Sequence, residues 1–159
     1  MKKMKIAIVH DWLTGMRGGE KVLEVLCELY PDATLVTLLH NKGMLSSTIE
    51  KMNIKTSFID KLPKKEKKYR NYLPLFPLAI ELIDFSEYDL IISTSHCVAK
   101  GAKPNKNGLH ICYCHTPMRY VWEMYDEYFG KDKAGFVTRA AMSIFAPQLR
   151  KWDVRTSSR

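Results

Sequence analysis

Three histidines each follow a short apolar segment of the sequence, namely His10, His96 and His115. Asp11 comes directly after the first of them, and Ser95 directly before the second. Imidazole and carboxylate groups bind polar ligands and exchange protons near neutral pH, so they are typical of binding and catalytic sites. One such histidine is usually structural, but three at the ends of neighbouring strands would form a substrate cleft.

A glycine-rich loop separates the first histidine from a helical pattern. Gly18 and Gly19 directly precede that pattern, and Arg17 adds a cation. The first N–H groups of a helix face an anion placed at its start, and glycine lets the ligand come close. The spacing G-M-R-G-G is not the dinucleotide pattern G-x-G-x-x-G, so the loop favours a phosphate or diphosphate, or is simply a tight turn.

A second helix start is predicted at Thr116, which is followed by Pro117 and by the cation Arg119. Threonine is a common N-cap, and proline is favoured in the first turn. Two helix N-termini, supported by Arg17 and Arg119, would then face one anion, and His115 would face the reacting sugar of a phosphosugar ligand.

Other chemistry is less well supported. The three histidines, with Cys97 or Cys114 nearby, are zinc-type ligands, but no pair has the close spacing of a structural zinc site. We therefore expect no metal. Neither Ser95 nor Cys97 lies in the glycine pattern of a nucleophile elbow, so a covalent nucleophile is not expected.

The elements that position these groups alternate between strand and helix patterns, which predicts an open α/β sheet. Helical spacing is expected after Gly19, at 43–52, up to about residue 85, after Thr116, and at 136–152 with a kink at Pro147. With the usual strand order 3-2-1-4-5, the first, fourth and fifth strands lie side by side, and their carboxyl ends meet in one crevice. The strands are expected at 6–9, 33–39, 54–59, 89–93 and 109–114.

Composition sets the class of protein. The 159 residues are 46% hydrophobic and 26% charged, which is typical of a single globular domain. Neither a membrane span nor a signal peptide is apparent, so we expect a cytoplasmic protein with its four cysteines reduced and buried. The 25 basic against 17 acidic residues, net +8, favour an anionic partner.

Much of this positive charge lies in one basic stretch, followed by the apolar segment at 72–77. Such a combination suits an anionic membrane surface, although a solvated loop with ordinary lysines has the same composition. No nucleic-acid motif accompanies the charge, so nucleic acid is not expected. The cations of the stretch are Lys61, Lys64, Lys65, Lys67, Lys68 and Arg70.

Three segments resemble a known family in the same order along the chain: HDWLTGMRGGEKVLE, YLPLFPLAIELIDFSEYDLIISTSHCVAKG and HICYCHTPMRYVWEMYDEYF. They are similar to the N-terminal half of bacterial family 4 glycosyltransferases of the mannosyltransferase-like kind. The resemblance implies a GT-B architecture, with two Rossmann-like domains across a cleft. It also implies retaining transfer of a hexose from a nucleotide-sugar to a glycan or lipid-linked acceptor, without metal or cofactor.

Under this resemblance, Gly18 and Gly19 approach the donor diphosphate, and His115 lies against the donor sugar. The basic stretch lies in the region that holds some members to the inner face of the cell membrane. Residues 1–159 would form the acceptor-side domain, and the donor domain with its E-x7-E carboxylates is absent. We therefore expect a chain that needs a C-terminal domain or a partner chain to transfer sugar. The alternative is a non-catalytic module that binds a membrane or a phosphosugar.

Overall fold

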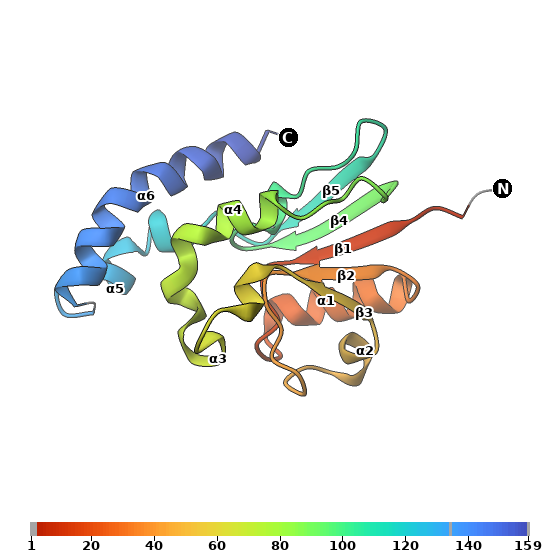
Figure 1. Ribbon diagram of the computed structural model, residues 1–159, viewed down its shortest axis with the longest axis horizontal. Helices are drawn as coiled ribbons and strands as arrows, with labels where there is room; N and C mark the ends of the chain where they lie inside the picture. Colours follow the sequence, from red (N-terminus) through yellow and green to blue (C-terminus); the bar gives the residue numbers. More distant parts are fainter. Residues whose placement is uncertain (1–2, 134, 159) are drawn as a thin grey trace.

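The protein is an open α/β structure of the Rossmann-like kind, seen in a computed structural model that describes residues 3–133 and 135–158 (Figure 1). Its single sheet has five strands, all parallel, in the order β3-β2-β1-β4-β5. The predicted fold class and strand order are therefore confirmed. The strands are β1 (Ile6–His10), β2 (Thr34–Thr37), β3 (Asn53–Thr56), β4 (Leu90–Ser95) and β5 (Leu109–Cys114).

The centre of the sheet follows from the apolar character of β1 and β4. Ile8 of β1 lies between Leu35 of β2 and Ile92 of β4 in register, and all three side chains are buried. A strand that is apolar on both faces is stable only when helices cover both faces. This requirement places β1 and β4 in the interior of the sheet.

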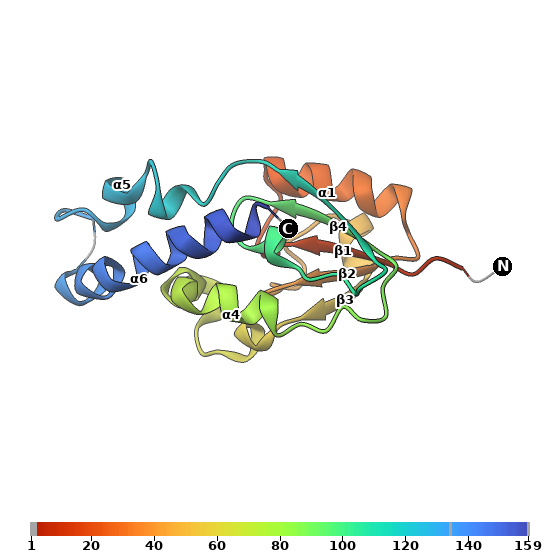
Figure 2. The same ribbon diagram turned by 90° about the horizontal axis from the view of Figure 1, so that it is seen from above.

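Helices form one layer on each side of the sheet (Figure 2). On one side, α1 (Gly18–Leu29) and α2 (Ser47–Glu50) bury Leu23, Cys27 and Ile49 against the strands. On the other side, α4 (Phe76–Glu81) lies over a larger, aromatic-rich core, and α6 (Phe136–Thr156) packs against that core and extends beyond the carboxyl ends of the strands. The predicted short helix at 43–52 is thus present as the shorter α2.

Short helical turns make up the remaining connections. One group lies between β3 and α4, and includes the α-helical turn α3 (Lys65–Lys68) in the basic stretch. The other turns flank β5. The short helix α5 (Tyr125–Phe129) follows them and precedes α6. The 3₁₀ turns are η1 (Phe58–Lys61), η2 (Tyr69–Leu75), η3 (Ala99–Gly101) and η4 (Arg119–Val121).

The prediction of a helix that begins at Thr116 is wrong. Met118 and Val121, three residues apart, are fully buried. The backbone forms a short turn here, in which Val121 N–H donates a hydrogen bond to Met118 O. Thr116 lies in a bend outside the helical elements, and the first helical turn after β5 is η4. The backbone of Met118 has φ −66° and ψ 81°, which lies outside the helical region, so no continuous helix runs from Thr116 into the next turn.

Strand β5 forms an open edge of the sheet, and it is the least covered strand. Its side chains are mostly exposed, including Cys112 and Cys114, because the helices on each face cover its neighbours instead. The expectation of four buried cysteines therefore holds only for Cys27 and Cys97, although all four are free thiols.

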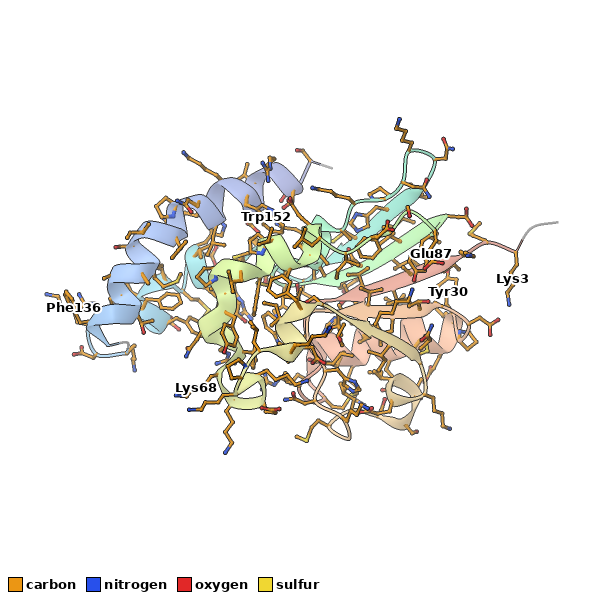
Figure 3. The ribbon with its side chains drawn as sticks, viewed as in Figure 1. Lys3, Tyr30, Lys68, Glu87, Phe136 and Trp152 are labelled. Atoms are coloured by element: carbon orange, nitrogen blue, oxygen red, sulfur yellow. The ribbon has the colours of Figure 1, made fainter. Side chains whose placement is uncertain are left out.

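Helix α6 is fixed to the rest of the protein mainly through its C-terminal half. Asp153 lies 2.8 Å from the ammonium of Lys100, and both side chains are buried. Trp152 points from α6 toward α4, where its indole N–H donates to Glu81 at 2.7 Å (Figure 3). The helix continues through Pro147, where the sequence predicted a kink. None of the described helices, α6 included, is both long and apolar enough to cross a membrane.

Candidate functional site

The carboxyl ends of β1, β4 and β5 bring the three predicted histidines together in one region, which we call the crevice. His10 ends β1, His96 follows β4, and His115 follows β5. The rings of His10 and His96 are 6.1 Å apart between centroids. A Cβ placed on Gly19 would lie 3.6 Å from both His10 Cε1 and His115 Nε2. The glycine loop therefore lies against two of the three imidazoles.

The N-terminus of α1 opens onto the crevice. The first hydrogen bond of the helical ladder runs from Lys21 N–H to Arg17 O, so the N–H groups of Gly18 and Gly19 precede that ladder. The carboxylate of Glu20 accepts a hydrogen bond from Arg17 N–H at 3.1 Å, which fixes the first turn. The N–H groups and the helix dipole favour an anion at this position.

His10 is the most unusual group in the crevice. Its side chain has no exposed surface, and neither ring nitrogen has a hydrogen-bond partner among the described residues. Its nearest charged neighbour is Glu20, at 3.7 Å between Nε2 and Oε1. Burial opposes ionisation of Glu20, but His10 and the backbone N–H groups lower the pKa of that carboxyl overall. His10 is therefore a buried imidazole that faces the Glu20 carboxylate and forms no hydrogen bond of normal length among the described residues.

Asp11 holds the turn after β4, a role that the sequence did not suggest. Its buried carboxylate accepts four backbone N–H bonds at 2.6–3.0 Å. Oδ2 also lies 3.0 Å from His96 Nδ1. Burial would raise the pKa of Asp11, but His96 and the N–H bonds hold it well below its usual range. Asp11 is therefore a positioning residue for His96 and does not face a ligand. The four donors belong to His96, Cys97, Val98 and Ala99.

The pKa values of His96 and His115 are shifted in opposite directions. Burial favours neutral His96, but the carboxylate of Asp11 outweighs it and raises the pKa of His96. Burial, together with His10 and His96, lowers the pKa of His115, whose Nε2 lies 2.7 Å from Thr94 Oγ1. The crevice therefore combines an imidazole whose pKa is raised with one whose pKa is lowered.

The other predicted cleft residues lie close by but differ in exposure. Ser95 is fully buried below the crevice, where its carbonyl accepts the N–H of His115 at 2.8 Å. Thr116 is half-buried, and Arg17 and Arg119 are exposed. Because no helix begins at Thr116, α1 is the helix whose N-terminus opens on the crevice in the described structure.

The cations of the basic stretch are exposed, except for Lys65. That ammonium pairs with the carboxylate of Asp60 and donates to His40 O at 3.1 Å, so it is not available to an external anion. Beside the stretch, the outer side of η2 and α4 exposes three leucines, Leu75 (40%), Leu78 (53%) and Leu82 (65%). The remaining cations of the stretch, all exposed, are Lys61, Lys64, Lys67, Lys68 and Arg70.

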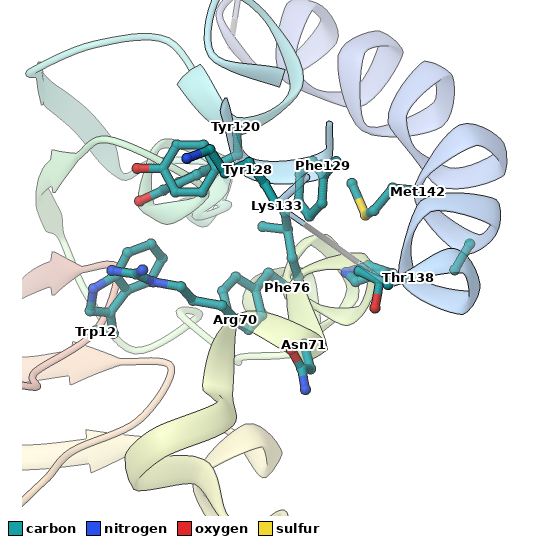
Figure 4. A pocket seen from close by; sticks show the side chains of 14 residues that line it. Trp12, Arg70, Asn71, Phe76, Tyr120, Tyr128, Phe129, Lys133, Thr138 and Met142 are labelled. Atoms are coloured by element: carbon teal, nitrogen blue, oxygen red, sulfur yellow. The ribbon is translucent and has the colours of Figure 1, made fainter. Parts of the chain in front are cut away.

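Sequence reasoning missed a cavity between η2, α5 and α6, which we call the aromatic pocket (Figure 4). It has a volume of about 510 Å³, and Trp12, Tyr120 and Tyr128 are among its lining residues. The sequence signal was the group of aromatic residues after Thr116, in a segment for which helical spacing was expected. The rings instead converge with Trp12 from the other end of the chain.

Within residues 3–133 and 135–158, no three His, Cys, Asp or Glu side chains are grouped so as to hold a metal ion. Comparison with protein-family models, with curated proteins and with solved structures found no match to this chain.

Proposed function

We propose that this chain is the acceptor-side domain of a retaining glycosyltransferase. The enzyme would transfer a hexose of the mannose type from a nucleotide-sugar to a glycan or lipid-linked acceptor. The observation that carries the proposal is the N-terminus of α1, where Gly19 lies against His10 and His115. An anion site beside two imidazoles suits a diphosphate linked to a sugar.

In this proposal each group has a separate role. The N–H groups of Gly18 and Gly19 bind the donor diphosphate beside the rings of His10 and His115. His115 faces the sugar. In the transfer, the bond between the anomeric carbon and the diphosphate breaks, and a bond to the acceptor oxygen forms on the same side. The acceptor proton leaves with the diphosphate or with a base.

The chain alone is expected to be inactive, because the diphosphate leaves with a negative charge that must be stabilised. The crevice already contains the carboxylates of Asp11 and Glu20, and Arg17 is exposed at its edge. A C-terminal domain or partner chain would supply the remaining cations. Detectable sugar transfer by the purified chain, with a nucleotide-sugar and an acceptor, would contradict this part of the proposal.

The test compares two adjacent glycines in the purified chain. A methyl group at position 19 would contact His10 and His115, whereas a methyl group at position 18 meets nothing within 4 Å. Nucleoside diphosphate is titrated while the imidazole NMR signals are followed. We expect Gly19→Ala to weaken binding by about tenfold or more, and Gly18→Ala by less than about twofold. Absence of binding, or equal effects of the two variants, would reject the donor site.

The alternative, a non-catalytic module that binds an anionic membrane or a phosphosugar, is favoured by one observation. The exposed cations of the basic stretch lie next to the exposed leucines of η2 and α4, which is the combination that an anionic lipid surface attracts. Either function would place the protein peripherally at the inner face of the cell membrane.

Vesicle binding tests this membrane contact. Replacing Lys64, Lys67 and Lys68 with glutamine should abolish most binding to vesicles that contain anionic lipid, at about 1 kcal/mol per cation. The matched control removes three exposed lysines elsewhere, Lys42, Lys51 and Lys106. Equal losses of vesicle binding in both triple variants would indicate a nonspecific effect of net charge and would reject the basic stretch as the membrane contact.

A further inference from the structure

The aromatic pocket lies at the junction of three segments that are distant in sequence. Trp12 comes from the loop after β1, Phe76 begins α4, and Tyr120 lies in η4. Tyr128 and Phe129 of α5 and Met142 of α6 complete the apolar wall (Figure 4). A cavity of about 510 Å³ lined mainly by aromatic and aliphatic groups has the size and character of a small-molecule site.

Two cations line this pocket, Arg70 from η2 and Lys133 from the turn before α6. The Arg70 side chain runs toward Trp12, and Lys133 reaches toward Tyr120 and Tyr128 (Figure 4). Among the described residues neither cation forms an ion pair, and no aspartate or glutamate lines the pocket. Two cations without a counterion beside an apolar cavity favour an anionic ligand.

Trp12 joins the pocket to the crevice. Its ring lies edge-on to His96 at 4.5 Å between centroids, and 6.3 Å from the ring of Tyr120. One aromatic side chain thus forms a wall of the pocket and contacts the crevice. Burial raises the pKa of Tyr120, so its phenol stays neutral and does not repel an anion.

We propose that the aromatic pocket binds an organic phosphate. Arg70 and Lys133 would bind the phosphate oxygens, and the rings of Trp12, Tyr120 and Tyr128 would contact the body of the ligand. The body can be a sugar ring or an alkyl chain, because both pack against aromatic faces. Binding of an organic phosphate in the pocket does not depend on the proposed function. If that function is correct, the pocket would hold the acceptor, and this assignment rests on the proposed function.

The alternative explanation is structural. The guanidinium of Arg70 lies 5.7 Å from the ring of Tyr69, so Arg70 can be regarded as a cation–π contact that only supports the fold. That explanation predicts no ligand and a loss of stability when Arg70 is replaced. Since Arg70 is exposed, the ligand explanation predicts the reverse: unchanged stability and lost binding.

The experiment uses the complete chain and two probes, hexose 1-phosphate for a sugar body and octyl phosphate for an alkyl body. Binding is followed through the NMR signal of the Trp12 indole, with inorganic phosphate as the reference ligand. We expect at least one organic phosphate to bind about tenfold tighter than inorganic phosphate, and the tighter of the two identifies the source.

Variants give the second readout. Arg70→Gln and Lys133→Gln should each lower the affinity for the organic phosphate that binds by about tenfold or more, because each removes a charged hydrogen-bond donor. Lys68→Gln, an exposed lysine outside the pocket lining, should change affinity by less than about twofold. No saturable binding of either probe, equal affinity for inorganic phosphate, or an equal loss in Lys68→Gln would overturn the proposal.

The same samples separate this inference from the proposed function. Gly19→Ala should leave binding of the organic phosphate unchanged, and Arg70→Gln should leave binding of nucleoside diphosphate unchanged. If only the nucleoside diphosphate fails to bind, the donor site is rejected and the aromatic pocket remains. If only the organic phosphates fail to bind, the aromatic pocket is rejected and the donor site remains.

Discussion

The crevice and the aromatic pocket lie on either side of Trp12, but they are built in different ways. In the crevice, polar groups at the ends of β1, β4 and β5 are held by hydrogen bonds such as those of Asp11, whose donors lie 85–88 residues away. In the aromatic pocket, the walls are rings on short helices, such as Tyr120 and Tyr128 with centroids 4.9 Å apart.

This difference means that the crevice holds its groups in fixed positions, whereas the aromatic pocket can adapt to a ligand. The crevice carries buried charges in fixed places, and its geometry therefore depends on a few strong contacts. The aromatic pocket depends on many weak contacts, and rings on short helices can adjust to a ligand at small cost. Variants at the two places should therefore differ in size of effect, and the following predictions test that order.

The largest effect is expected for Asp11→Asn. The amide has one oxygen in place of two acceptors and presents an NH₂ group to backbone donors, so buried N–H groups lose their partners. We expect the free energy of unfolding, from urea titration, to fall by about 3–5 kcal/mol. Asp132→Asn, at an exposed carboxylate, should stay within about 0.5 kcal/mol. A loss below about 1 kcal/mol at Asp11 would contradict the contrast between the two regions.

A smaller effect is expected for Gly101→Ala, where the turn after β4 meets α6. A Cβ at this position would lie 2.5 Å from Cζ2 of Trp152, a buried ring that also donates to Glu81. We expect a loss of about 1–3 kcal/mol from overpacking, measured by the same titration. Gly18→Ala, which meets open space, is the matched control. Equal stability of the two variants would show that α6 can move away at little cost.

In the aromatic pocket we expect a weaker coupling. A double-mutant cycle of Tyr120→Leu and Tyr128→Leu measures the edge-on ring contact without the common loss of apolar area. The interaction free energy should be about 0.5–1.5 kcal/mol. A coupling as large as the effect of Asp11→Asn would show that the pocket is as tightly specified as the crevice.

The smallest effect concerns pH. The folded pKa of His96 is raised, so its contribution to stability is present below the unfolded pKa and is lost as pH rises through the folded pKa. Between about pH 5.5 and 8.5, wild type should therefore lose more stability than His96→Gln. The difference is small because about a fifth of the His96 side chain is exposed (21%). Parallel pH profiles would show that the Asp11–His96 pair contributes no pH dependence.

The strand order was predicted as the usual one for such sheets, and the interior position of β1 was predictable because it depends on a pattern that one segment carries by itself. Residues 6–9 are apolar on both faces, and that requires an interior strand. The absence of a helix at Thr116 was not predictable, because the local signals for a helix start were present, while the non-helical backbone at Met118 depends on the rest of the fold. The exposure of Cys112 was not predicted either, because the predicted strand order placed β5 at an edge but did not show how little the helices cover it.

The convergence of the three histidines followed from the strand order, and the structure brings them together. The hydrogen bonds of Asp11 could not be predicted, because its donors are backbone N–H groups that any sequence would offer. The aromatic pocket combines Trp12 with rings more than a hundred positions later in the chain. A sequence pattern describes neighbours along the chain and gives no measure of such distant contacts.

The carboxylate of Asp11 also makes hydrogen exchange in the turn after β4 a measure of unfolding. The amides of His96 to Ala99 donate to a fully buried oxygen pair that lies outside the regular sheet ladder. They can exchange hydrogen with solvent only when β1 and the turn after β4 separate, and closing that long chain segment again carries a large entropic cost. Slow deuterium uptake in this turn would therefore follow opening of the whole sheet, whereas uptake elsewhere in loops would follow local fluctuation.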